Sequence, residues 1–422
     1  MEVIRTKLAE EIYLTWLPAK KFKTSLLSAQ FVTPLNKESA SAYAMLPSVL
    51  RRGTVSCPDM GSIAKKLDRL YGARIDGVVR KIGESQCLGF VASLIDDRFA
   101  PGGERLLEPA AGLLGELICD PVTEGGLFVS DYFESEKVNL IDAIRSILND
   151  KRTYADRRLL QELCAGEAYG VSRLGDEASA EKLRVKNLYA QYRRLISSAR
   201  LEVFYCGAAE RERVEQAVQT ALAALPRTRT EELAPVRPHV SRPEPRYVSE
   251  RLDVTQGKLG MGFSCGSEDY PALLLGNALF GGSSNSRLFL HVREKLSLCY
   301  YASSTYHRKK GLITVSSGIE FENYRKACDE ILSQLESVRQ GRLEDWELEA
   351  ARSTLLNAYA SMGDSQGKLE NFFISQAATG QNETLEGLAE QVRTVSLDRV
   401  RRAMETVKLD TVYFLQGKEA EA

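Results

Sequence analysis

Histidine is scarce in this sequence, with three residues among 422: His239, His291 and His307. A helix brings two histidines onto one metal ion when they are four residues apart, and no pair here has that spacing. A helix-borne site with two histidines is therefore excluded. We expect all three histidines at the surface, although the sequence leaves open a cluster of His, Cys and carboxylates from distant parts of the chain.

Long apolar runs and paired cysteines are missing as well. No run approaches the roughly 20 residues of a membrane-spanning helix, and the start, MEVIRTKLAEE, is charged where a secretory signal has an apolar stretch. The eight cysteines are scattered without a CxxC pair, as in reduced proteins. Net charge is −1, with Lys and Arg spread along the chain. We expect a cytoplasmic protein with no membrane span and no nucleic-acid partner.

Several common catalytic motifs are also absent. There is no GxxxxGK[ST] loop to hold a phosphate, and the glycines and serines at 281–284 lack the GxSxG spacing of a serine nucleophile. No cysteine lies in a sequence signature that marks the catalytic cysteine of a known enzyme family. The sequence therefore predicts neither a P-loop enzyme nor a hydrolase with its own serine or cysteine nucleophile.

What the chain does contain is enough material for two domains. Hydrophobic residues make up 44% and charged residues 27%, as in soluble globular proteins. Five of the 13 prolines lie between 226 and 250, and proline removes backbone donors that helices and central strands need. We therefore predict an N-terminal domain at 1–225, a proline-rich linker at 226–250 and a C-terminal domain at 251–422.

Both predicted domains follow the same order of elements: strand, two helices, two strands, a helix, a long helix, a further helix and a last strand. The segment 67–73 resembles 296–301 in its position, and 134–148 resembles 346–359. A repeat of about 200 residues is too long for a solenoid, whose periods are roughly 20–50. The pattern indicates two copies of one α+β domain.

A glycine-rich stretch, Gly281-Gly282-Ser283-Ser284-Asn285-Ser286-Arg287-Leu288-Phe289, runs on through His291–Lys295 to Leu298–Tyr301. It resembles the second-domain signature of the pitrilysin/insulinase family of zinc metallopeptidases, in which an Arg and a Tyr seven residues later face the cleft. The matching residues here are Arg293 and Tyr300. The resemblance covers essentially the whole chain. It implies two tandem homologous domains, each a mainly antiparallel sheet covered by helices.

Active members of this family carry HxxEH on an early helix, followed by a Gly-Thr pair. Aligning that pair with Gly53-Thr54 puts Ala44 and Ser48 at the histidine positions and Pro47 at the glutamate. The family's third zinc ligand is a Glu seven residues after another Glu. Glu136 stands at the first of these positions, and Ala143 at the ligand. The resemblance thus implies that the zinc motif is degenerate at Ala44, Pro47, Ser48 and Ala143, and that the chain holds no metal cofactor. Without zinc, we expect Glu136 to be solvated or to cap a helix.

The family uses its Arg/Tyr pair to donate hydrogen bonds to the scissile carbonyl oxygen, which becomes negative in the transition state. In the two-domain bacterial branch, the zinc of one subunit lies opposite the second domain of another. The resemblance therefore implies that this chain is inactive alone. It would be the zinc-less subunit of a heterodimeric endopeptidase, whose partner is a zinc-bearing HxxEH homologue and whose substrate is a peptide or unfolded polypeptide.

Several alternatives remain open from the sequence. The chain could be a catalytically inert peptide-binding or scaffold protein of the same fold, or it could hold a metal at another site. For Arg293 and Tyr300, the plain alternative is a surface ion pair and a half-buried aromatic. By family analogy we expect peptide to add to an edge strand near Gln86–Leu94; an ordinary paired strand accounts for that segment equally well.

Overall fold

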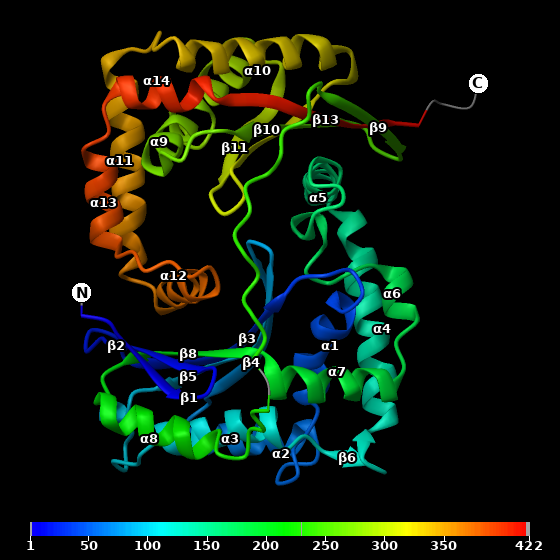
Figure 1. Ribbon diagram of the computed structural model, residues 1–422, viewed down its shortest axis with the longest axis vertical. Coiled ribbons are helices and arrows are strands. Elements are labelled where there is room, and N and C mark those ends of the chain that lie inside the picture. Colours follow the sequence, from blue (N-terminus) through cyan, green and yellow to red (C-terminus); the bar gives the residue numbers. More distant parts are fainter. Residues whose placement is uncertain (1, 229, 419–422) are drawn as a thin grey trace. The chain divides into compact units, whose positions relative to one another are not determined.

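The computed structural model describes residues 2–228 and 230–418 (Figure 1). The chain forms two compact units. Unit 1 is Met1–Arg145, Val171–Pro235 and Ser365–Asn382, and unit 2 is Ser146–Gly170, Val236–Asp364 and Glu383–Ala422. Each unit has its own hydrophobic core. No helix in the described part of the chain combines the length and the apolar content needed to cross a bilayer.

Unit 1 is built on one six-stranded sheet, which is antiparallel except for one parallel pair. In spatial order its strands are β1 (Ile4–Ala9), β2 (Ile12–Pro18), β8 (Arg200–Gly207), β3 (Thr24–Pro34), β5 (Ser85–Ile95) and β4 (Arg74–Ile82). The parallel pair is β2 with β8. Strand β3 is buried along nearly its whole length, because it lies in the middle of the sheet and both of its faces are covered.

The helices of unit 1 lie on both faces of this sheet. They are α1 (Ala40–Leu50), α2 (Met60–Asp68), α3 (Leu107–Cys119), α4 (Ser130–Ser146), α6 (Glu177–Glu181), α7 (Val185–Ser198), α8 (Arg211–Ala221) and α12 (Gln366–Ala378). Helix α12 packs on β3 and β8, on the side of the sheet away from α3 and α8 (Figure 1). A short hairpin, β6 (Thr123–Glu124) with β7 (Leu127–Phe128), precedes α4.

Unit 2 contains a five-stranded sheet, in the order β11 (Cys299–His307), β12 (Leu312–Ile319), β10 (Gly257–Cys265), β13 (Val407–Gly417) and β9 (Arg246–Leu252). Its helices are α5 (Lys151–Leu163), α9 (Tyr270–Phe280), α10 (Tyr324–Arg339), α11 (Asp345–Met362), α13 (Leu385–Arg393) and α14 (Leu397–Glu405), together with a π-helical segment at Leu288–Lys295. Helix α5 packs on β10 and β13, on the side of the sheet opposite to α10 (Figure 1).

The two sheets share one topology. The order β2-β8-β3-β5-β4 of unit 1 matches β9-β13-β10-β12-β11 of unit 2, and each contains one parallel pair. The correspondence extends to α5 and α12. Each follows the long helix of one half, α4 or α11, and each packs on the sheet of the unit that the other half builds. The predicted α+β fold with two homologous copies is confirmed.

Two predictions differ from the structure. The segment 86–94 is not an edge strand: it lies in β5, between β3 and β4, and the edge is β4. Which of these two consecutive strands pairs with β3 depends on tertiary contacts. The last residues of the proposed linker also form regular structure, because β9 begins at Arg246, directly after the final proline. Strand β9 lies at the edge of its sheet, where a neighbouring proline removes no hydrogen bond that the sheet needs.

Candidate functional site

The four residues predicted to occupy degenerate zinc positions lie on α1 and α4 of unit 1. Helix α1 is apolar and buried except at Ser48, so Ala44 and Pro47 face the core whereas Ser48 is exposed. Pro47 packs against Gly77 of β4, where an added Cβ would stand 2.9 Å from the proline Cβ. Ala143 is exposed on α4.

These residues do not fit a zinc ion. Zinc needs thiolate, imidazole or carboxylate ligands, and the four positions offer two methyl groups, a proline ring and one exposed hydroxyl. Among the described residues, three or more potential metal ligands come together at one place. It lies in unit 2 and consists of Cys164, Glu167 and His239.

Glu136 remains in the structure with a different partner. Its side chain is buried rather than solvated, which corrects the expectation from the sequence. The Arg52 guanidinium, just beyond the end of α1, forms an ion pair with Oε1 and donates to Ser135 Oγ at 2.8 Å. Asn139 Nδ2 donates to Oε2 at 3.1 Å. Arg52 thus supplies the positive charge that a buried carboxylate requires, and it joins α1 to α4.

The two predicted donors lie on one segment of unit 2. Arg293 stands near the end of the π-helical segment, and its side chain is 41% exposed. Its guanidinium lies over the Phe289 ring, with 4.7 Å from Cζ to the ring centroid, and its Nε is 3.5 Å from Glu294 Oε1. A donor held in this way keeps N–H groups that solvent or a ligand can reach.

Tyr300 is 62% exposed at the start of the edge strand β11. Its hydroxyl donates to Glu320 Oε1 at 2.8 Å. This hydrogen bond and the negative charge of Glu320 raise the pKa of Tyr300, so the phenol stays protonated at neutral pH. The plain alternative of a half-buried aromatic does not describe this side chain.

A tight reversal connects Arg293 to Tyr300. Ser297 N donates to Arg293 O at 3.1 Å, and Leu298 N donates to Val292 O at 3.0 Å. Ser297 has φ +50°, a left-handed conformation that non-glycine residues adopt mainly in turns. These backbone bonds hold the beginning of β11 against the end of the π-helical segment.

The glycine-rich turn has a structural explanation. A Cβ on Gly281 would lie 2.6 Å from Leu288 Cδ1 and 2.7 Å from Ser304 Oγ, so only glycine allows this approach. Asn277 O accepts from the backbone N–H groups of Gly281 and Gly282. Sequence reasoning missed a further anchor, the buried ion pair of Arg287 Nε with Glu347 Oε1 at 3.0 Å. Its two residues are 60 positions apart with no motif to link them.

The prediction of three surface histidines is wrong for His239, whose side chain is 3% exposed. Its Nδ1 lies 2.6 Å from Glu167 Oε1 and its Nε2 lies 3.2 Å from Asp410 Oδ2. His307 is partly buried, with Tyr169 on one ring nitrogen and Thr314 on the other. Burial lowers the pKa of His291, which contacts Arg287.

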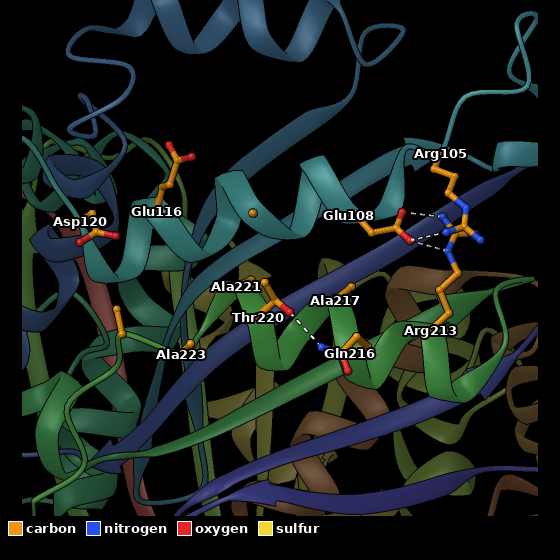
Figure 2. Close-up of a pocket in the computed structure, with 12 residues that line it drawn as sticks. Arg105, Glu108, Glu116, Asp120, Arg213, Gln216, Ala217, Thr220, Ala221 and Ala223 are labelled. Carbon is orange, nitrogen blue, oxygen red and sulfur yellow. Dashed lines mark hydrogen bonds and ion pairs between the residues drawn. The ribbon is translucent and has the colours of Figure 1, made fainter.

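A hollow of about 680 Å³ lies between α3 and α8 of unit 1 (Figure 2). Its charged side chains are largely paired. Arg213 donates to both oxygens of Glu108, at 2.8 and 2.7 Å, and Lys66 Nζ lies 2.9 Å from Glu116 Oε1. The rest of the wall is mostly small side chains such as Ala217 and Ala221. This arrangement stabilises the helix pair and presents no recognisable set of catalytic groups.

Comparisons with known proteins show which proteins this chain resembles. Residues 182–355 match a family model described as the peptidase M16 inactive domain. The probable inactive metalloprotease YmfF of Bacillus subtilis is 32% identical over 406 residues, covering 95% of this chain and 94% of that protein. An uncharacterized zinc protease of the same organism, YmxG, is 25% identical over 37% of this chain and 41% of its own length.

Solved structures give the same fold. A conserved protein from Enterococcus faecalis superposes with a TM-score of 0.91 at 26% identity, over 100% of both chains. A peptidase M16 inactive domain from Pseudomonas fluorescens superposes with a TM-score of 0.81 at 17% identity, again over 100% of both chains. At this lower identity the likeness shows the fold alone.

Proposed function

This chain belongs to the M16 peptidase family as an inactive-type member, and we propose that it is the non-catalytic subunit of a heterodimeric zinc endopeptidase. The partner would be a homologue that carries HxxEH and binds the zinc. This subunit would help to bind a peptide or unfolded polypeptide and would supply Arg293 and Tyr300 to the partner's site. Its location would be the cytoplasm.

One contrast carries the proposal. The family's zinc positions have lost every suitable ligand, whereas the side chains of Arg293 and Tyr300 remain exposed. Peptide hydrolysis builds negative charge on the scissile carbonyl oxygen, and fixed donors aimed at that oxygen are worth about 2.7–4 kcal/mol each. A guanidinium and a protonated phenol are suitable donors at neutral pH.

Peptide binding would use the edge strand β4. Within the described chain β4 pairs with β5 on one side, and its other edge has no strand beside it. An extended peptide can add to such an edge through backbone hydrogen bonds, which favour affinity over sequence selectivity. The exposed Arg74, Asp76 and Gly77 border this edge. The peptide is thus proposed on β4 in place of the segment expected from the sequence.

The test is a peptidase assay on a quenched, unstructured peptide. It compares this chain alone, an HxxEH homologue from the same organism alone, and the two mixed. We expect activity from the mixture well above that of either protein. Arg293→Ala should lower the kcat of the mixture by about 10²–10³-fold, because one transition-state donor is lost.

Arg402→Ala is the matched control, since Arg402 is an exposed arginine of unit 2 on α14. It should leave the activity unchanged, and both variants should retain the circular dichroism spectrum of the parent chain. If the mixture is no more active than the HxxEH homologue, or if Arg293→Ala has no effect on it, the shared-site proposal is wrong.

A second candidate is an inert peptide-binding or scaffold protein. The observation that favours it is the hydrogen bond that the Tyr300 hydroxyl already donates to Glu320. The hydroxyl would have to break this bond to reach a substrate. Under this alternative, the quenched peptide of the assay binds to the chain, and no mixture cleaves it. A change of Gly77 on β4 to proline would then weaken binding, because proline disturbs the backbone of the edge strand.

A further inference from the structure

Three potential metal ligands converge in unit 2 outside the sites described so far. Cys164 follows directly after α5, Glu167 lies in the turn that leaves this helix, and His239 belongs to the extended segment before β9. One ligand atom from each residue lies within 4.8 Å of the others. The thiol is fully buried and the imidazole nearly so.

The backbone presents Cys164 and Glu167 together. Glu167 N donates to Cys164 O at 3.0 Å and closes a turn across 164–167. Gly166 in this turn has φ +83°, a conformation in which a side chain would be strained. His239 is brought to the turn by a backbone bond, from its N–H to Lys310 O at 2.8 Å. The position of each ligand is therefore set by main-chain bonds as well as by its side chain.

A second carboxylate orients the imidazole. Asp410 is fully buried, and its Oδ2 lies 3.2 Å from His239 Nε2. Arg242 holds Asp410 in place, through its backbone N–H at 2.9 Å and through Nη1 at 2.6 Å. A histidine that donates one N–H to a carboxylate turns its other nitrogen toward the metal in many zinc sites. Here the other nitrogen, Nδ1, faces Glu167 Oε1, and the Cys164 thiol belongs to the same group of ligand atoms.

The charges of the cluster are compatible with a dication. Lys310 is almost completely buried and forms an ion pair with Glu167 Oε2, so Oε1 is the oxygen directed at His239. A dication binds the unprotonated Nδ1, the carboxylate oxygen Oε1 and the thiolate, so its binding releases to solvent any proton that these atoms carry in the metal-free protein. Each proton released offsets one positive charge of the ion.

From this geometry we propose that Cys164, Glu167 and His239 bind one transition-metal dication of the Zn²⁺ class, with Asp410 as the outer carboxylate that orients His239. Thiolate, imidazole and carboxylate together select a borderline-soft ion such as Zn²⁺ over Mg²⁺ or Ca²⁺. Three protein ligands leave the fourth position to water.

The bound ion joins segments of unit 2 that lie far apart in the sequence. It fastens the segment around His239 to the end of α5 and, through Asp410, to β13. A cysteine-nucleophile reading of Cys164, His239 and Asp410 is not supported, because the thiol is fully buried and a substrate carbonyl has no access to it. The site is separate from the family's zinc positions on α1 and α4 and does not depend on the proposed peptidase partnership.

The test is a Co²⁺ titration of the full chain after chelator treatment. Co²⁺ replaces Zn²⁺ in such sites, and a bound thiolate gives a charge-transfer absorption that reports Cys ligation directly. We expect saturation with one ion per chain. Cys164→Ser should abolish the thiolate band, and Asp410→Asn should weaken affinity by about 10–100-fold while the band is retained at saturation.

Cys328→Ser and His291→Ala are the matched controls, because they remove a cysteine and a histidine of unit 2 that lie outside the cluster. Both should bind Co²⁺ as the parent chain does. A thermal melt with and without Zn²⁺ gives a second measurement: the parent chain should melt higher with the ion, and Cys164→Ser should show no such rise.

Two results would overturn the proposal. One is a parent chain that shows neither a thiolate band nor a Zn²⁺-dependent rise in melting temperature. The other is a band that persists in Cys164→Ser. In either case the cluster is an ion-pair network that needs no metal.

Discussion

Among the described residues, each buried carboxylate forms an ion pair with an arginine. The pairs are Glu11–Arg200, Asp96–Arg98, Glu136–Arg52, Glu202–Arg5, Glu347–Arg287, Glu370–Arg80 and Asp410–Arg242. Burying an unpaired charge is very unfavourable, and arginine compensates a carboxylate with several donors in one plane. At the residue scale, the chain therefore balances its buried acids with protein cations.

Tyr300 is the residue whose removal tests the proposed chemistry most narrowly. Tyr300→Phe deletes one hydroxyl and keeps the ring, so the activity of the mixture with an HxxEH homologue should fall by about 10²–10³-fold in kcat. Tyr247→Phe, at an exposed tyrosine of β9, should have no effect. Kinetics of the two variants in parallel provide the measurement. Equal activities would show that the hydroxyl of Tyr300 takes no part.

The raised pKa of Glu202 predicts that the stability of the protein depends on pH. Burial is the main cause that raises its pKa to about 7, against the opposing effect of Arg5. The native state therefore holds a proton that the unfolded chain loses above its ordinary carboxyl pKa. The contribution of Glu202 to the free energy of unfolding is full below about pH 4 and falls as the pH rises through about 7.

Glu202→Gln removes this titration and keeps the shape of the side chain, and Arg5 is exposed enough to be solvated without its partner. The fall in stability between about pH 5 and about pH 8 should be smaller in the variant by about 1–3 kcal/mol. Urea unfolding at both pH values measures it. Glu212→Gln, at an exposed carboxylate of α8, should lose as much stability between the two pH values as the parent chain does. If the free energy of unfolding of Glu202→Gln falls between the two pH values by as much as that of the parent chain, the raised pKa of Glu202 is contradicted.

At the scale of elements, close packing depends on where a helix carries glycine. Helix α3 has two glycines three residues apart. A Cβ on Gly115 would stand 2.1 Å from the Ala221 carbonyl oxygen of α8, whereas one on Gly112 meets nothing within 4 Å and opens on the hollow of Figure 2. Gly115 thus sets the distance between α3 and α8, and Gly112 does not.

The two glycines should respond oppositely to alanine. Gly112→Ala should raise the free energy of unfolding by up to about 1 kcal/mol, because alanine favours the helix and no contact opposes it. Gly115→Ala should lower it by about 1–3 kcal/mol, because the helices must separate or strain. Denaturant unfolding of both variants compares them directly. The same sign of change in both would show that backbone propensity outweighs the packing of α3 on α8.

At the scale of the whole molecule, the two halves of the sequence exchange a helix. Glu370 of α12 accepts hydrogen bonds from Gln30 and Arg80 of the sheet in unit 1, and Leu159 of α5 packs with Tyr413 and Leu415 in unit 2. Each sheet is therefore completed by a segment encoded in the other half of the chain.

This exchange predicts that neither half folds by itself. Fragments 1–235 and 236–422, expressed separately, should lack cooperative unfolding, because each loses the helix that covers one face of its sheet. Co-expressed fragments should purify together and unfold cooperatively. Circular dichroism melts and co-purification through a tag on one fragment provide the measurement. A fragment 1–235 that melts cooperatively alone would show that α12 is dispensable for unit 1.

Much of this arrangement could be predicted from the sequence because it is local. The long helix that became α4, the strands β3 and β10, and the helix α9 all follow from hydrophobic periodicity and helix-ending residues. The edge position of β4 could not be predicted, because the order of strands along the chain does not say which of two consecutive strands pairs with β3. The burial of His239 could not either, since its partners Glu167 and Asp410 are 72 and 171 residues away.

The sequence by itself determined the family, through the glycine-rich stretch at 281–289, and the repeat, through the order of elements. It also predicts a degenerate zinc motif at Ala44, Pro47, Ser48 and Ala143. Only the tertiary structure decided how buried charge is balanced, as with Glu136 and Arg52, and which distant side chains meet, as at Cys164 and His239. The physical reason is that motifs and periodicity are local properties of the chain. Long-range pairing depends on the packing of whole elements, which no short stretch of sequence encodes.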